Sequence, residues 1–169
     1  MSVFIAKTAK LEGNAWVGGH ARVSDNTWVR GNAWVCGNAR VEGNACVSGS
    51  ARVYSNAVVA DNARVDGNAY VYGDAQIWGN AMVYGTSKVL DNAQVSGNAK
   101  VSVNACVKGK ARVYDNAQVS GDAQVSGNTM VRGNVEIFGN TNIRSSILEG
   151  CVTISDGLIM DVHWWREIP

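Results

Sequence analysis

An aliphatic residue recurs at every sixth position of this chain, from Ile5 to Ile143, through 24 units without an insertion. Nearly all of these residues are β-branched, which suits strands better than helices. The residue two positions before each of them is usually small: it is Ala in 18 of the 24 units, and the exceptions are Val3, Thr27, Ser87, Thr129, Val135 and Thr141. A spacing of two places both side chains on the same side of a strand. The period therefore predicts a buried ladder of small and aliphatic side chains.

Glycine marks the expected corners between these short strands. It stands two positions after the aliphatic residue in 16 units, Asp takes that place in four, and Asn follows in 16. Gly-Asn and Asp-Asn pairs tolerate the positive φ angles of tight turns. The corners account for 16 of the 19 glycines, and the single proline is the last residue. The glycine content therefore indicates a regular, rigid chain and not flexible loops.

A unit of six residues is too short to be a self-sufficient hairpin or helix, so it has to stack on copies of itself. An unbroken period places each strand above a strand of an earlier turn, in parallel. Val and Ala then fill a narrow core, and corner Asn side chains can stack in ladders. The repeat thus predicts an all-β parallel solenoid.

These units resemble the bacterial hexapeptide-repeat family, in which a small residue follows an aliphatic one by four positions, as in Val35 and Ala39 or Val65 and Ala69. The resemblance implies a left-handed parallel β-helix with about eight triangular coils, built by residues 1–144. The G-N-A-x-V-x form of the unit looks like that of acyltransferase-like members. One difference is that large aromatic residues such as Tyr72 and Trp78 occupy positions where the family favours small or acidic ones.

Residues 145–169 depart from the period, and residues 158–165 are strongly apolar. A solenoid exposes its core at the last coil, so a short C-terminal cap is expected here. Trp164 and Trp165 are suited to cover that core. The alternative is a tail that swaps onto a neighbouring subunit.

With three units per coil, every third unit falls on the same face, and the third face gathers most outward aromatic residues. Its candidate binding or interface residues are two Trp, three Tyr and two cations, namely Trp16, Trp34, Arg52, Tyr54, Tyr70, Tyr72 and Lys88. An exposed apolar stripe of this kind indicates an interface. Because family members commonly form trimers, we expect a homotrimer built through this face. The alternative is that the rings only stabilise the sheet by cross-strand stacking.

Two histidines are candidate catalytic residues if the chain is an enzyme. His20 stands at a corner where Asn is usual, and His163 lies beside Asp161 near the C-terminus. Histidine titrates near neutral pH and suits general-base catalysis. The resemblance implies acetyl-CoA or another acyl-CoA as the cosubstrate of such an enzyme. Catalytic family members usually carry an inserted loop, however, and none interrupts the 24 units.

Charge and composition narrow the class of partner. The 15 Lys and Arg nearly balance the 14 Asp and Glu, which argues against a nucleic-acid polymer or a membrane surface as the partner. The chain shows neither a signal-peptide pattern nor a long apolar run, so a cytoplasmic location is expected. No CxxC spacing links the cysteines, so we expect free thiols and no metal site; the cysteines are Cys36, Cys46, Cys106 and Cys151.

Three functions follow as hypotheses. The first is a non-catalytic, oligomerising β-helical scaffold or binding module. The second is a CoA-dependent acyltransferase acting on a small acceptor, with His20 or His163 as its base. The third is a binder of a small anionic ligand, such as a nucleotide, in clefts between subunits, where rings stack and cations pair with the ligand. The missing loop and the scarcity of histidine favour the first or the third.

Overall fold

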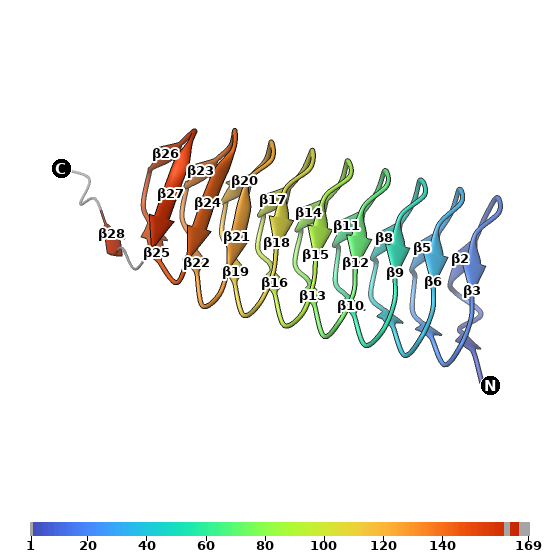
Figure 1. Cartoon of the computed structure of the whole chain (residues 1–169). Coiled ribbons are helices and arrows are strands. Elements are labelled where there is room, and N and C mark those ends of the chain that lie inside the picture. The colour runs from blue at the N-terminus through green and yellow to red at the C-terminus, as the bar shows by residue number, and fades with distance from the viewer. Residues whose placement is uncertain (1, 161–162, 166–169) are drawn as a thin grey trace.

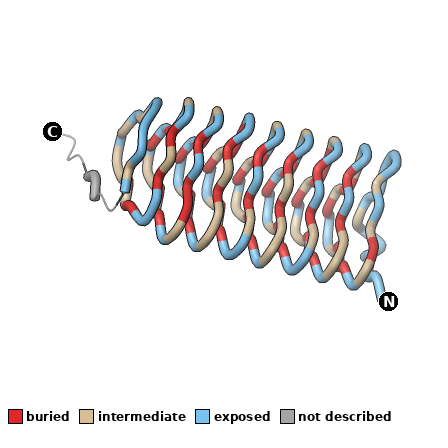
Figure 2. The backbone as a smooth tube through the Cα atoms, viewed as in Figure 1, coloured by how far each residue is buried: buried red, intermediate tan, exposed pale blue. Residues whose placement is uncertain are grey.

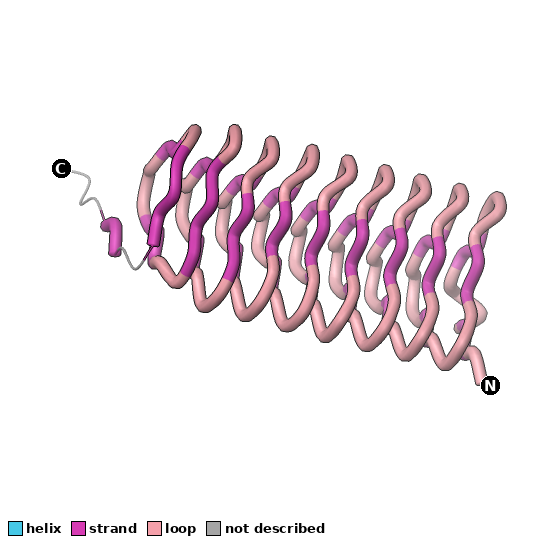
Figure 3. The backbone as a smooth tube through the Cα atoms, in the orientation of Figure 1, coloured by secondary structure: helices cyan, strands magenta, loops and turns pink. Residues whose placement is uncertain are grey.

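The computed structural model describes residues 2–160 and 163–165, which form one elongated solenoid of short parallel strands (Figure 1). Strands of successive coils stack into three sheets, and the described residues contain no helix (Figure 3). It follows that no helix in this part of the chain could cross a membrane. The predicted all-β parallel solenoid is confirmed.

The three sheets run along the whole length of the solenoid, and each coil adds one strand to each. Sheet A consists of β1 (Phe4–Ile5), β4 (Arg22–Val23), β7 (Arg40–Val41), β10 (Val58–Val59), β13 (Gln76–Ile77), β16 (Gln94–Val95), β19 (Arg112–Val113), β22 (Met130–Val131), β25 (Ile147–Glu149) and β28 (His163–Trp165). Sheet B consists of β2 (Lys10–Leu11), β5 (Trp28–Val29), β8 (Cys46–Val47), β11 (Arg64–Val65), β14 (Met82–Val83), β17 (Lys100–Val101), β20 (Gln118–Val119), β23 (Glu136–Ile137) and β26 (Thr153–Ile154). Sheet C consists of β3 (Trp16–Val17), β6 (Trp34–Val35), β9 (Arg52–Val53), β12 (Tyr70–Val71), β15 (Lys88–Val89), β18 (Cys106–Val107), β21 (Gln124–Ser126), β24 (Thr141–Arg144) and β27 (Gly157–Met160).

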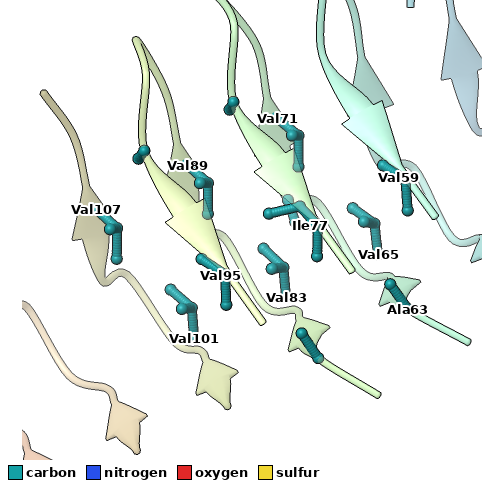
Figure 4. Close-up of a cluster of buried hydrophobic side chains, with 14 of the residues drawn as sticks. Val59, Ala63, Val65, Val71, Ile77, Val83, Val89, Val95, Val101 and Val107 are labelled. Carbon is teal, nitrogen blue, oxygen red and sulfur yellow. The ribbon is translucent and has the colours of Figure 1, made fainter. Parts of the chain in front are cut away.

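The core is the predicted ladder of small and aliphatic side chains. Val59 pairs with Val41 in the preceding coil and with Ile77 in the following one, and all three are fully buried. Figure 4 shows the rows that such pairs form, one row for each sheet. Burying each Val contributes roughly 1.5 kcal/mol. Buried segments recur in the coils between Ala21 and Leu148, while the bends are largely exposed (Figure 2). In the first coil the predicted ladder is not buried, because no coil precedes it, and Ile5 and Leu11 are exposed.

The corners have the predicted backbone. All 16 corner glycines have positive φ, as have the four corner Asp residues. The predicted amide ladders are also present. In the longest one, at the corner between sheets A and B, each Asn Nδ2 donates to the Oδ1 of the next coil's Asn over 3.0 to 3.2 Å, through Asn44, Asn62, Asn80, Asn98, Asn116 and Asn134.

The expected count of about eight coils is one too small. After Ile143 the register shortens, because Val131 pairs with Leu148 and Ile143 with Ile159, so β25 to β27 still extend the three sheets. A search for an unbroken six-residue period misses this coil because it has lost residues at its corners. Whether the C-terminus caps its own coil or a neighbour's stays a prediction. The side chains of Trp164 and Trp165 and residues 166–169 lie outside the described part.

Candidate functional site

The predicted third face is the outer surface of sheet C, and all seven of its candidate residues lie there together. Strand register places Trp34 between Trp16 and Arg52, and Tyr70 between Arg52 and Lys88. Tyr54 and Tyr72 form a second column of the same sheet, two residues after Arg52 and Tyr70. We call this set of seven residues the aromatic platform.

Trp16 and Trp34 form the N-terminal end of the aromatic platform. Their ring centroids lie 5.2 Å apart with the planes inclined at 49°, and the two residues are 47% and 49% exposed. Trp16 lies over Gly18, because a Cβ atom at Gly18 would stand 2.2 Å from Cη2 of the indole. Sequence reasoning overlooked Gly18. The available signal is that it is the only glycine directly following a core aliphatic residue of the repeat.

Arg52 joins the two halves of the platform. Its guanidinium carbon lies 5.7 Å from the ring centroid of Trp34 and 5.4 Å from that of Tyr70. Cation–π contacts at exposed sites contribute about 0.5–1 kcal/mol each. The rings and the cation Arg52, which the sequence places on one face, therefore contact one another directly in this part of the sheet.

Tyr54 and Tyr72 stack in parallel, with centroids 5.0 Å apart and an interplanar angle of 4°. Burial raises the pKa of the Tyr54 hydroxyl, and the neighbouring Tyr72 and Tyr70 raise it further. Burial likewise raises the pKa of Tyr72. The two phenols therefore pack closely and hold their protons more tightly than free tyrosine does.

The cysteine thiols provide no metal centre in the described part of the chain. Cys36 and Cys106 lie on sheet C, where burial raises the pKa of both thiols. Cys46 lies on sheet B, and Cys151 is exposed beyond β25. Among the described residues, no group of three or more His, Cys, Asp or Glu is arranged to hold a metal ion.

The two histidines lie far apart, because His20 follows β3 and His163 begins β28 at opposite ends of the solenoid (Figure 1). His20 is exposed at the corner between sheets C and A, and its backbone N–H donates to the Gly37 carbonyl over 2.7 Å. The next residue in its corner column is Asn38, an amide and not a carboxylate that could orient the imidazole. The backbone of His163 pairs with Ile147, while its side chain lies outside the described part.

A shallow depression on sheet B was not predicted from the sequence. It measures about 330 Å³ and is lined by Arg64, Asp66, Met82, Tyr84 and Lys100. Register places Met82 between Arg64 and Lys100 in adjacent strands. Two cations therefore stand on either side of an apolar floor. The spacing of 18 residues between Arg64, Met82 and Lys100 is the signal that could have revealed it.

Comparison with known proteins agrees with this architecture. The YdcK β-solenoid repeat matches three segments of the chain, residues 33–49, 75–89 and 111–127. The chain is thus a β-solenoid repeat protein, and the predicted resemblance to bacterial β-helical repeat proteins is confirmed. No curated protein matches the chain.

Among solved structures, the chain is similar to the UDP-N-acetylglucosamine acyltransferase from Campylobacter jejuni. The two are 15% identical, and the match covers 89% of this chain and 68% of that one, with a TM-score of 0.36.

Proposed function

We propose that this protein is a non-catalytic β-helical scaffold that self-associates into a homotrimer through the aromatic platform of sheet C. The observation that carries the proposal is the side-by-side exposure of Trp16 and Trp34, each about half exposed. Covering their exposed halves removes roughly 200 Å² of apolar surface from water, which contributes about 5 kcal/mol per face. Trp is enriched among the few residues that carry most of the binding energy of protein interfaces.

The surroundings of His20 support a non-catalytic role. A general base in an acyltransferase needs a partner that orients its imidazole and a cleft that holds the acyl donor. His20 is exposed and begins a corner column that continues with Asn38 and Asn56. The strand register is also uninterrupted from Phe4 to Ile143, so no inserted loop stands beside His20 to complete a pocket.

The test is sedimentation velocity on the full chain and two tryptophan variants. Trp34→Ala is expected to weaken association at least about thirtyfold, the effect of losing an interface centre worth about 2 kcal/mol. Trp28→Ala is the matched control, because Trp28 has the same strand position on sheet B. Association that survives Trp34→Ala unchanged would contradict the proposal.

Calorimetry with acetyl-CoA separates the scaffold from the acyltransferase. The scaffold proposal expects no heat beyond dilution at high micromolar acetyl-CoA. Saturable heat that disappears in His20→Asn would contradict it and support catalysis with His20 as the base. The Asn variant is suitable because Asn is the usual residue at this corner position.

A second candidate function is the binding of a small anionic ligand, which the depression on sheet B favours. Arg64 and Lys100 could pair with phosphate oxygens on either side of Met82, and Tyr84, which is 41% exposed, could stack on a ring. Titration with ADP would test this function. Binding that is lost in Lys100→Glu would support it, and an absence of binding at millimolar ADP would contradict it.

A further inference from the structure

The near-neutral net charge conceals a separation of charge between the faces and the edges of the solenoid. Of the fourteen described Lys and Arg residues, twelve lie at outward strand positions, together with only five of the twelve described acids. The other seven acids lie at the corners, with only two cations. The flat faces are therefore basic and the edges acidic, so the molecule is complementary to copies of itself.

Sheet C shows this separation most strongly. Its outward strand positions hold four cations and no acid; the cations are Arg52, Lys88, Lys108 and Arg144. The ion pairs of the described residues, Arg40–Glu42 and Arg132–Glu149, both lie on sheet A. Two sheet C surfaces packed against each other would bring eight cations together, so the surface that covers this face has to be acidic.

Threefold symmetry itself places an edge against a face. The three faces of a triangular solenoid point in evenly spaced directions, and a third of a turn about a parallel axis exchanges those directions among themselves. No face of one copy then opposes a face of its neighbour. The surface of the neighbour that points toward sheet C of the first copy is instead an edge between two sheets. Because the neighbour is rotated by a third of a turn, this edge is one of the two that flank the neighbour's own sheet C.

The two flanking edges differ in where they carry charge. The edge between sheets C and A, called the C–A edge, carries Asp74 and Asp91, beside the middle of the solenoid. The edge between sheets B and C carries Asp122 and Asp156. Asp122 lines a depression together with Lys88 of its own copy, but it stands at the height of Gln124, two coils beyond Lys88. Copies related by a parallel threefold axis stand at the same height. Asp74 shares a coil with Tyr70, so it meets the partner's sheet C between Arg52 and Lys88.

Asp74 is held ready for such a contact. It is exposed, and its Oδ1 accepts a hydrogen bond from Asn56 Nδ2 over 2.9 Å, which leaves Oδ2 for a partner. Asp91 accepts from the Gly109 backbone N–H over 3.0 Å with its Oδ2 and keeps its other oxygen. Both carboxylates are thus oriented by the corner backbone or by an amide ladder before any partner arrives.

We propose that the sheet C face of one copy binds the C–A edge of the next, with the Asp74 carboxylate between Arg52 and Lys88 of the neighbouring copy. This assignment rests on the proposed self-association and names the surface that covers the aromatic platform. The three identical contacts of a ring then use the basic face and the acidic edge of every copy.

Charge reversal on each side tests the assignment. Lys88→Glu on the face and Asp74→Lys on the edge are each expected to raise the trimer's dissociation constant at least about tenfold. The combined variant restores opposite charges and is expected to regain most of the affinity. Asp74→Lys suits the backbone, because Lys110 occupies the same corner column two coils later.

Matched controls separate this contact from a general effect of charge. Arg112→Glu changes the same strand position on sheet A, and Asp122→Lys removes a carboxylate that likewise ends an amide ladder, with Asn104 at 2.9 Å. Both controls are expected to associate within about twofold of wild type. Circular dichroism melting of each variant confirms that it is folded.

The outcomes distinguish the assignment from the scaffold proposal. A wild-type chain that stays monomeric overturns both the edge assignment and the scaffold proposal. Both are also overturned if the monomer instead binds a polyanion such as heparin through Lys88 on sheet C. A wild-type trimer that tolerates Lys88→Glu and Asp74→Lys overturns only the edge assignment. A trimer broken by Asp122→Lys and not by Asp74→Lys also overturns it, because the other flanking edge is then the partner.

Discussion

The Asp61 carboxylate accepts a hydrogen bond from the backbone N–H of Gly79, one coil further along, with Oδ2 and N 3.0 Å apart. Asp25, Asp91 and Asp115 make the same contact to the glycine of the next coil. A side chain at a positive-φ corner projects toward the following corner, so glycine is needed there. A column here is the set of corner residues that stack from coil to coil. Wherever the repeat is regular, each positive-φ residue other than glycine is followed by glycine at the same corner of the next coil.

Corner substitutions are expected to depend on the column neighbours. Gly31→Asp places an Asp between Gly13 and Gly49 and should cost about 1 kcal/mol of unfolding free energy, the usual strain of positive φ. A Cβ would meet the next corner's backbone at 2.8 Å at both sites, but Gly73→Asp is followed in its column by Asp91, which carries a side chain and a like charge, whereas Gly31→Asp is followed by Gly49. Gly73→Asp should therefore cost at least about 1 kcal/mol more. Urea denaturation measures both, and equal losses would contradict this account of the corners.

Much of the fold could be predicted from the sequence because a strict period acts at every level. The same six-residue spacing determines which side chains are buried, where the backbone turns and which residues stack in the next coil. The placement of Trp34 between Trp16 and Arg52 follows from this period together with the three units per coil that the family resemblance implies. Eighteen residues make one coil, so columns can be read directly from the residue numbers.

The remaining features depend on local shape and charge. The inclination of Trp16 depends on Gly18, a missing side chain that no hydrophobic pattern reveals. The ninth coil has shortened corners, so it leaves the period while keeping its buried Leu148. The separation of basic faces from acidic edges follows from the positions of the charged residues in the sequence, but the net charge of +1 does not show it. His20 is a candidate base because of its residue type, and the folded column adds that its neighbour Asn38 supplies an amide and no carboxylate.

The amide ladder should stabilise the solenoid measurably. Asn80 accepts from Asn62 over 3.2 Å and donates to Asn98 over 3.1 Å, so Asn80→Ala should cost about 1 kcal/mol of unfolding free energy. Asn68→Ala is the control, because the Asn68 side chain makes no such hydrogen bond among the described residues. The backbone N–H of Asn68 donates to a corner carbonyl, as the backbone N–H of Asn80 does. Thermal or urea denaturation compares the two. Equal effects would mean that the ladder contributes no net stability.

Thiol reactivity should follow exposure and burial. Cys151 is exposed, whereas burial raises the pKa of Cys36 and Cys106 and so lowers their thiolate fraction. Iodoacetamide at pH 8 is therefore expected to modify Cys151 first, as followed by peptide mass spectrometry. Labelling of Cys36 or Cys106 at the same rate as Cys151 would contradict this expectation.

Alkaline pH should weaken the folded chain through the stacked tyrosines. The pKa of Tyr54 and Tyr72 is raised mainly by burial, so the folded state holds these protons more tightly than the unfolded state. Their contribution to stability is complete below the ordinary tyrosine pKa of about 10 and is lost as pH rises through the folded pKa. Absorbance at 295 nm and melting temperature follow the change. Replacing both by Phe should reduce the alkaline loss of stability, whereas Tyr84→Phe on sheet B should not.

The most direct test of the central claim is the mass of the unmodified full chain in solution. Sedimentation equilibrium at micromolar concentration and moderate salt measures it without assuming a shape, which matters for an elongated solenoid. The account predicts a species of about 54 kDa, three times the 17.9 kDa of one chain. A mass of 17.9 kDa across the concentration range would contradict the proposal that sheet C binds a second copy.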